Sequence, residues 1–132
     1  MKSNLGTRLL RISAVYLVAG LVAGFGIGIT KSFWLASVHT HILMLGWAAS
    51  AVIGITYLVL PGSGETRLAT WHFWGHNLGL PVMVTGLTLE ASGYKDAGPV
   101  LAGGSIVVLL SLFAFAVNLF RTGRAMSAAR TA

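Results

Sequence analysis

Four long apolar stretches, separated by short polar segments, dominate the pattern along the chain. Each stretch is close to or above the roughly 20 residues that an α-helix needs to cross a bilayer. Their approximate bounds are Ile12–Ile29, Phe33–Leu60, Trp71–Ala91 and Gly98–Phe120. The pattern predicts an all-α integral membrane protein with a single four-helix transmembrane domain over residues 1–132. Residues 121–132 form a basic tail, which we expect to be disordered.

The composition agrees with a membrane protein. The chain has 132 residues, of which 55% are hydrophobic and 9% charged, and its mean hydropathy of +0.81 lies outside the range of soluble domains. The basic start and apolar first stretch are also typical of a signal peptide. However, the segment 24–31 offers no clear small-x-small cleavage site and the stretch is long for a signal sequence, so we expect a mature helix.

The basic residues are distributed unevenly between the two ends of the predicted helices. Seven of them fall on one side, namely Lys2, Arg8, Arg11, Arg67, Arg121, Arg124 and Arg130. Only Lys31 and Lys95 fall on the other side. The positive-inside rule therefore predicts cytoplasmic termini in a multi-pass protein of a bacterial-type inner membrane. The net charge of +6 reports this topology, with some attraction to anionic lipid, and does not indicate nucleic-acid binding.

Two histidines, His39 and His41, lie near the start of the second apolar stretch. Ionisable side chains inside a membrane are costly, so we treat both as candidate site residues. Residues two apart on an α-helix lie roughly 200° apart around its axis, so the two rings face opposite sides. They cannot chelate one ion together, and we expect a metal or haem iron on at least one side. The alternative is a hydrogen bond from one ring to a carbonyl of a neighbouring helix.

These histidines belong to a longer pattern, which consists of His39-Thr40-His41, Leu45-Gly46-Trp47, Gly54, Tyr57 and Pro61. The pattern resembles the tenth membrane span of the catalytic subunit of haem-copper oxidases and nitric oxide reductases, most closely that of the C-type oxidases. The resemblance implies that His39 is a high-spin haem ligand and His41 a low-spin haem ligand. It favours b-type haem as the cofactor and leaves room for copper. Because the chain contains no cysteine, thiolate ligation and iron–sulfur clusters are excluded.

A second histidine pair, His72 and His76, lies at the start of the third stretch. The two residues are four apart, hence on one helix face, where they could share a metal ion. The alternative is an interfacial position in an aromatic belt with the neighbouring tryptophans. The string Trp-Gly-His-Asn at 74–77 resembles the copper-site helix of C-type oxidases, although the charge-based topology starts this helix on the opposite side. Counting 1.5 Å per residue places His76 ~20 Å in height from His41, which predicts that the two pairs share no metal.

Glycines recur at four-residue spacing in the first stretch, at Gly20, Gly24 and Gly28. Small residues on one stripe let a neighbouring membrane helix approach closely. We therefore expect tight helix packing at this stripe. A groove that accommodates a flat macrocycle is the alternative.

A single chain cannot close a bis-histidine haem site, because its outer pair faces opposite ways on one helix. A symmetric oligomer can close it. The resemblance implies a homotrimer, since the oxidase subunit has three four-helix arcs with approximate threefold symmetry.

We expect a haem protein that transfers electrons or binds oxygen or nitric oxide, with an electron donor or respiratory complex as partner. We do not expect full oxygen reduction, because a second oxidase-type histidine span and a histidine–tyrosine pair are missing. The alternatives are a haem- or copper-handling assembly factor and a structural subunit of a respiratory complex.

Overall fold

The computed structural model describes residues 4–131, and this part of the chain is helical, with no strand. The long helices are α1 (Leu5–Thr30), α4 (Arg67–Ala91) and α5 (Gly98–Thr131). The second apolar stretch is one continuous rod built from η1 (Phe33–Leu35), α2 (Ala36–His41), the π-helix η2 (Ile42–Ala49) and α3 (Ser50–Val59). Short 3-10 turns, η3 (Ser63–Glu65) and η4 (Lys95–Ala97), precede α4 and α5.

Three of these rods are long and apolar enough to cross a membrane, which confirms the membrane class predicted from the sequence. They are Leu5–Thr30, Phe33–Val59 and Lys95–Ala129. Helix α4 has 25 residues and the length to span, but it does not reach the same hydropathy. The first half of α4 contains the second histidine pair and an asparagine, which lower its mean hydropathy.

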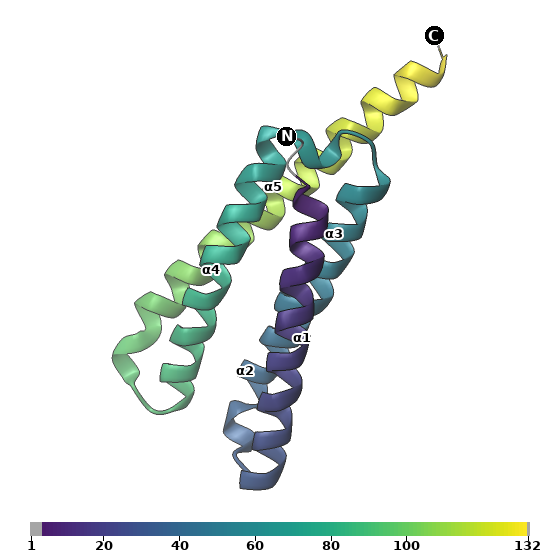
Figure 1. The fold of residues 1–132 in the computed structure, drawn as a ribbon. Helices are drawn as coiled ribbons and strands as arrows, with labels where there is room; N and C mark the ends of the chain where they lie inside the picture. The colour runs from purple at the N-terminus through teal and green to yellow at the C-terminus, as the bar shows by residue number, and fades with distance from the viewer. Residues whose placement is uncertain (1–3, 132) are drawn as a thin grey trace.

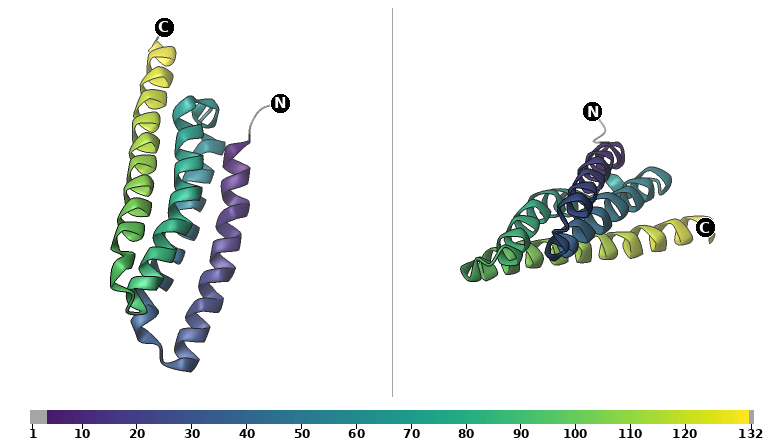
Figure 2. Two further views of the ribbon diagram at one scale, coloured as in Figure 1. Left: turned by 90° about the vertical axis from the view of Figure 1, so that its left-hand side faces the viewer. Right: turned by 90° about the horizontal axis from the view of Figure 1, so that it is seen from below.

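The helices form two antiparallel hairpins. One hairpin pairs α1 with the rod from α2 to α3, and the other pairs α4 with α5 (Figure 1). The two hairpins meet beside the start of α1, and α4 also contacts α2 and η1 further along. Helix α5 lies along α4, and its last turns project beyond the other helices (Figure 2). We call the end that carries the start of α1 and the α3–α4 connection the turn end.

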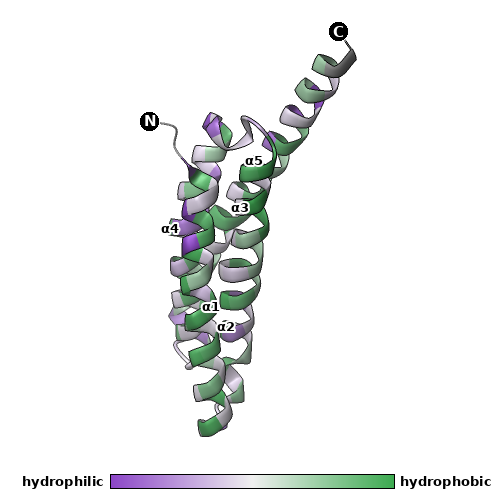
Figure 3. Ribbon diagram, turned by 45° about the vertical axis from the view of Figure 1, so that its right-hand side comes forward, coloured by the Kyte–Doolittle hydropathy of each residue, from purple (hydrophilic) through white to green (hydrophobic). Residues whose placement is uncertain are grey.

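The main apolar core lies between the hairpins at the turn end. Its buried residues come from α1, α3 and α4, and they are Leu5, Leu9, Ile53, Tyr57, Ala69 and Phe73. A second cluster of Leu80, Met83 and Val108 holds α4 against α5 further along. Many other large apolar side chains on all four rods are exposed, as expected for helices that are covered by lipid. Figure 3 shows that apolar residues extend along the rods.

Glycines set the close approach of α1 to the second rod. A Cβ on Gly20 would overlap the Leu43 side chain, and a Cβ on Gly24 would lie 2.6 Å from Cε1 of His39. The prediction of tight packing is therefore confirmed for Gly20 and Gly24. A Cβ on Gly28 would meet no atom within 4 Å among the described residues, so Gly28 takes no part. The space beside Gly24 is filled by the imidazole ring of His39.

The connection between the hairpins folds back along α3. Ser63 Oγ donates to the Leu60 carbonyl at 2.8 Å and approaches that of Thr56 at 3.5 Å. Asn118 Nδ2 of α5 donates to the Ser63 carbonyl at 2.8 Å, and Thr66 Oγ1 donates to Asn118 Oδ1 at 2.8 Å. Thr66 also caps α4 by accepting from the Ala69 N–H at 3.0 Å. Helix α4 therefore begins beside the last turn of α3 and not beyond it.

The charged residues are sorted between the two ends as the sequence predicted. Arg8, Arg11, Arg67, Arg121 and Arg124 belong to the turn end, whereas Lys31 and Lys95 lie in the connections at the opposite end. Lys2 lies outside the described residues. The prediction of a disordered tail is wrong for the residues described, because α5 continues to Thr131. The tail is rich in alanine and arginine, which are strong helix formers, so it extends the helix that precedes it.

The α4–α5 contact gives a test of glycine packing with a neighbouring control. A Cβ on Gly104 would overlap the backbone of Met83, whereas a Cβ on Gly103 meets nothing within 4 Å. We expect Gly104→Ala to lower the free energy of unfolding in detergent by about 1–3 kcal/mol, because the backbones must separate. Gly103→Ala should leave it unchanged or raise it by up to about 1 kcal/mol, because alanine favours helix. Equal effects of the two substitutions would contradict the observed packing.

Candidate functional site

His39 faces α1. Its Nδ1–H donates to the Gly20 carbonyl oxygen at 2.9 Å, and its ring lies in the notch left by Gly24. The hydrogen bond to a neighbouring helix is the alternative that the sequence left open for one of the two outer histidines. Because Nδ1 carries the proton, Nε2 of His39 has a free lone pair.

His41 faces away from α1, about 200° around α2 from His39. Its Nδ1–H donates to the Ser37 carbonyl oxygen of its own helix at 2.8 Å, and the side chain is half-buried. This bond also fixes the proton on Nδ1 and leaves the Nε2 lone pair free. Imidazoles that bind a metal commonly donate the other ring N–H to a carbonyl or carboxylate, which fixes the tautomer and the ring orientation. Both outer histidines have this arrangement.

His72 and His76 are fully buried between α4, α3 and η2. The Nε2–H of His76 is shared between the Leu45 carbonyl oxygen at 3.1 Å and Ser50 Oγ at 3.3 Å. His72 Nδ1 lies 3.2 Å from the Tyr57 hydroxyl. The ring centroids of the two histidines are 5.4 Å apart, so the helix spacing does bring the pair together. The interfacial alternative for this pair is wrong, because neither ring reaches the surface, whereas Trp71 beside them is 74% exposed.

Each buried ring keeps one nitrogen without a hydrogen-bond partner. Among the described residues these are the only two such buried side-chain atoms, His72 Nε2 and His76 Nδ1. His76 Nδ1 carries a lone pair, because its proton is on Nε2. An unsatisfied buried polar atom is costly, and in native proteins it commonly marks a bound water, an ion or a functional group.

The predicted height difference between the two histidine pairs is wrong. His76 bonds to the carbonyl of Leu45, and Leu45 follows His41 by four residues, or about 6 Å of helix rise. The error has two sources. The α3–α4 connection folds back along α3, and η2 is a π-helix, whose i→i+5 bonding places more residues in each turn.

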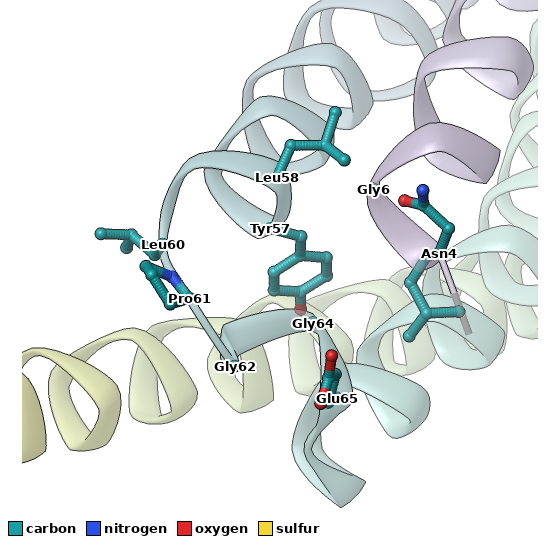
Figure 4. A pocket seen from close by; sticks show the side chains of 10 residues that line it. Asn4, Gly6, Tyr57, Leu58, Leu60, Pro61, Gly62, Gly64 and Glu65 are labelled. Carbon is teal, nitrogen blue, oxygen red and sulfur yellow. The ribbon is translucent and has the colours of Figure 1, made fainter. Parts of the chain in front are cut away.

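A cavity of about 320 Å³ at the turn end reaches Tyr57 from outside. Its wall includes Asn4 before α1, Gly6 of α1, and Leu60, Pro61, Gly62, Gly64 and Glu65 of the connection (Figure 4). Tyr57 stands among these residues, and its hydroxyl bonds to the buried His72. Tyr57 therefore lies between the cavity and His72.

Sequence reasoning missed three groups that hold the buried pair, namely Tyr57, Ser50 and the Leu45 carbonyl. Tyr57 was noted for its place in the oxidase-like pattern and not as a contact of His72. Tyr57 and Ser50 are seven residues apart, two turns of α3, and therefore share a face. The seven-residue spacing could therefore have predicted from the sequence that both side chains face the same neighbouring helix.

The described residues contain no group of three or more His, Cys, Asp or Glu side chains that could hold a metal ion. A site on either pair in one chain therefore has at most two protein ligands of these types. Comparison of the chain with known protein families, with curated proteins and with solved structures gives no match.

The contrast in burial predicts different structural roles for the histidines. We expect His76→Ala to lower the free energy of unfolding in detergent by about 3 kcal/mol, because it removes the link to Leu45 and leaves a cavity. His41→Ala should cost less than about 1 kcal/mol, because this ring is half-buried and bonds only to its own helix. Denaturant unfolding followed by circular dichroism measures both values. A larger loss for His41→Ala would contradict the packing described above.

Proposed function

We propose that this chain is a haem-binding membrane protein that transfers electrons or binds a diatomic gas. The observation that carries the proposal is the hydrogen bonding of His39 and His41, which fixes the position of the ring proton. Both donate Nδ1–H to backbone carbonyls and keep Nε2 as a free, oriented ligand atom. The donor set therefore fits haem iron. Haem, when bound, supplies a one-electron iron centre and a coordination position for a gas.

The two outer histidines differ in access. Both rings are half-buried, but the hydrogen bond of His39 is partly buried against α1, whereas that of His41 is exposed. We therefore infer that His41 faces a neighbouring copy, across from His39 or His41 of that copy. A homotrimer with one haem between neighbouring chains satisfies the ligand count when His41 of each chain meets His39 of the next, because three chains then supply six histidines to three haems.

The proposal includes a membrane topology. All four rods, α4 included, cross the bilayer of a bacterial-type inner membrane, and the arginine-rich turn end lies in the cytoplasm. Helix α4 has 25 residues, about 37 Å at 1.5 Å per residue, which is sufficient to cross. Its two histidines are buried inside the protein, so they do not meet lipid.

The visible spectrum of the purified protein, expressed with ample haem, tests the haem proposal. Wild type should show sharp reduced bands after dithionite, and His41→Ala and His39→Ala should each weaken or abolish them by removing an axial ligand. Thr40→Ala is the matched control, because Thr40 lies between the two histidines and bonds only to its own helix. A colourless wild type, or bands that survive in both histidine variants, would refute it. Haem in a monomer-sized species would refute the trimer.

A second candidate function, metal handling, is favoured by the buried pair. His72 Nε2 and His76 Nδ1 lie in the protein interior without partners, and the opposite nitrogen of each ring is held by an oxygen. Imidazole nitrogens suit copper and zinc, and this arrangement matches that of a supported metal ligand. The cavity at Tyr57 is the route of entry that we infer.

Metal analysis separates this candidate from the first. After equilibration with Cu⁺ or Zn²⁺ and removal of free metal, wild type should retain about one ion per chain. His72→Phe, which keeps an aromatic ring of similar size, should lose that ion, whereas His41→Ala should retain it. Retention of metal by His72→Phe, or its absence from wild type, would exclude a site on the buried pair.

A further inference from the structure

A groove runs along the outer face of the second hairpin, opposite the buried histidines. It encloses about 530 Å³ and is lined mainly by Trp71, Trp74 and Leu78 of α4 and by Val107, Leu110 and Ala114 of α5. Trp71 is 74% and Trp74 55% exposed, so the tryptophans form a wall that other parts of the chain do not cover. The groove is separate from the haem and metal candidates.

The groove has an apolar floor because small residues let the two helices approach closely. A Cβ on Gly75 would lie 2.9 Å from Cβ of Ser111. The Ser111 hydroxyl donates to the Val108 carbonyl of its own helix at 2.7 Å, so it is already satisfied. A slender hydrocarbon chain fits such a floor, whereas a polar ligand would find little to bond there.

Two arginines lie at one end of the groove. Arg67 precedes Trp71 by four residues, and Arg121 follows Ala114 by seven, so both lie on the helix faces that line the groove. Both side chains are exposed. The Thr66–Asn118 hydrogen bond of 2.8 Å ties the two helices together next to these arginines. The apolar walls of the groove therefore lead towards two exposed arginines on the same helix faces.

The dimensions match one leaflet of a bilayer. From Arg67 to Leu78 is eleven residues, about 16 Å along α4. Half of the roughly 30 Å hydrocarbon core is ~15 Å. We propose that the groove binds one acyl chain of an anionic phospholipid, whose phosphate is held by Arg67 and Arg121 at the turn end. Guanidinium groups bind phosphate through paired hydrogen bonds, which favours arginine in this place.

The charge of the chain favours lipid over a second copy in this groove. The chain carries nine basic and three acidic residues, and Glu65 is the one acidic residue at the turn end. A second copy would bring further arginines to Arg67 and Arg121. An anionic lipid brings the opposite charge and also the apolar chain that the walls require.

Tryptophan quenching by brominated lipid tests the proposal. In a variant with Trp34→Phe and Trp47→Phe, Trp71 and Trp74 are the remaining tryptophans. The protein is reconstituted in phosphatidylcholine vesicles that contain a small fraction of phosphatidylglycerol or phosphatidylcholine with brominated acyl chains. We expect half-maximal quenching at a roughly 25-fold lower fraction of brominated phosphatidylglycerol, about fivefold for each arginine.

Two variants and one control locate the site. Arg67→Gln with Arg121→Gln should abolish the preference for phosphatidylglycerol, whereas Arg8→Gln with Arg11→Gln, at the same end but on α1, should retain it. Ala114→Phe fills the groove without changing charge and should reduce quenching by both lipids. Equal quenching by the two lipids in the parent protein would overturn the proposal. Weak quenching by both would also overturn it, because it would mean that a second copy covers the groove.

Discussion

The hydrogen bond from His76 Nε2 to the Leu45 carbonyl, at 3.1 Å, is the contact on which the arrangement of the two hairpins depends. In an apolar interior a polar group must find a partner in the protein, because neither water nor lipid supplies one. The π-helix η2 provides that partner, since its wider turn presents the Leu45 carbonyl to Ser50 and to His76 together. The bond joins the centre of one hairpin to the first half of the other. It therefore sets the height at which the buried histidines lie relative to the outer pair.

The outer pair depends on a different constraint, the close approach of α1. The Gly20 carbonyl accepts the hydrogen bond from His39, and the absence of a side chain at Gly24 leaves room for the imidazole ring. A larger residue at position 24 would occupy the place of the ring, so the glycine and the histidine act as one unit. His41 has no such support from another helix and relies on the Ser37 carbonyl. The ring that is held most firmly is thus the less accessible one, and the more accessible ring is oriented by its own helix alone.

The sequence was sufficient for the helical class, the bounds of the apolar rods to within a few residues at most ends, and the opposite orientation of His39 and His41. These features depend on local periodicity and on the spacing of glycines, which a single chain displays. The position of His76 could not be obtained in this way. It depends on how Ser63 folds the connection back along α3 and on a π-helical segment, and neither leaves a periodic signal. The helical tail was also missed, because its basic, small residues were read as a separate segment and not as a continuation of α5.

The free nitrogens of the two histidine pairs lie in different surroundings. This difference decides which kind of ligand each pair could bind. The free nitrogens of the buried pair lie inside one chain and are without partners, so any occupant there must be small. The outer pair faces opposite ways, and α1, which His39 faces, carries no histidine of its own. A haem with two histidine ligands therefore requires a second protein surface that brings another histidine to the outer pair. Within the proposed assembly, haem binding and trimer formation then become one event, whereas metal binding by the buried pair requires only a single chain.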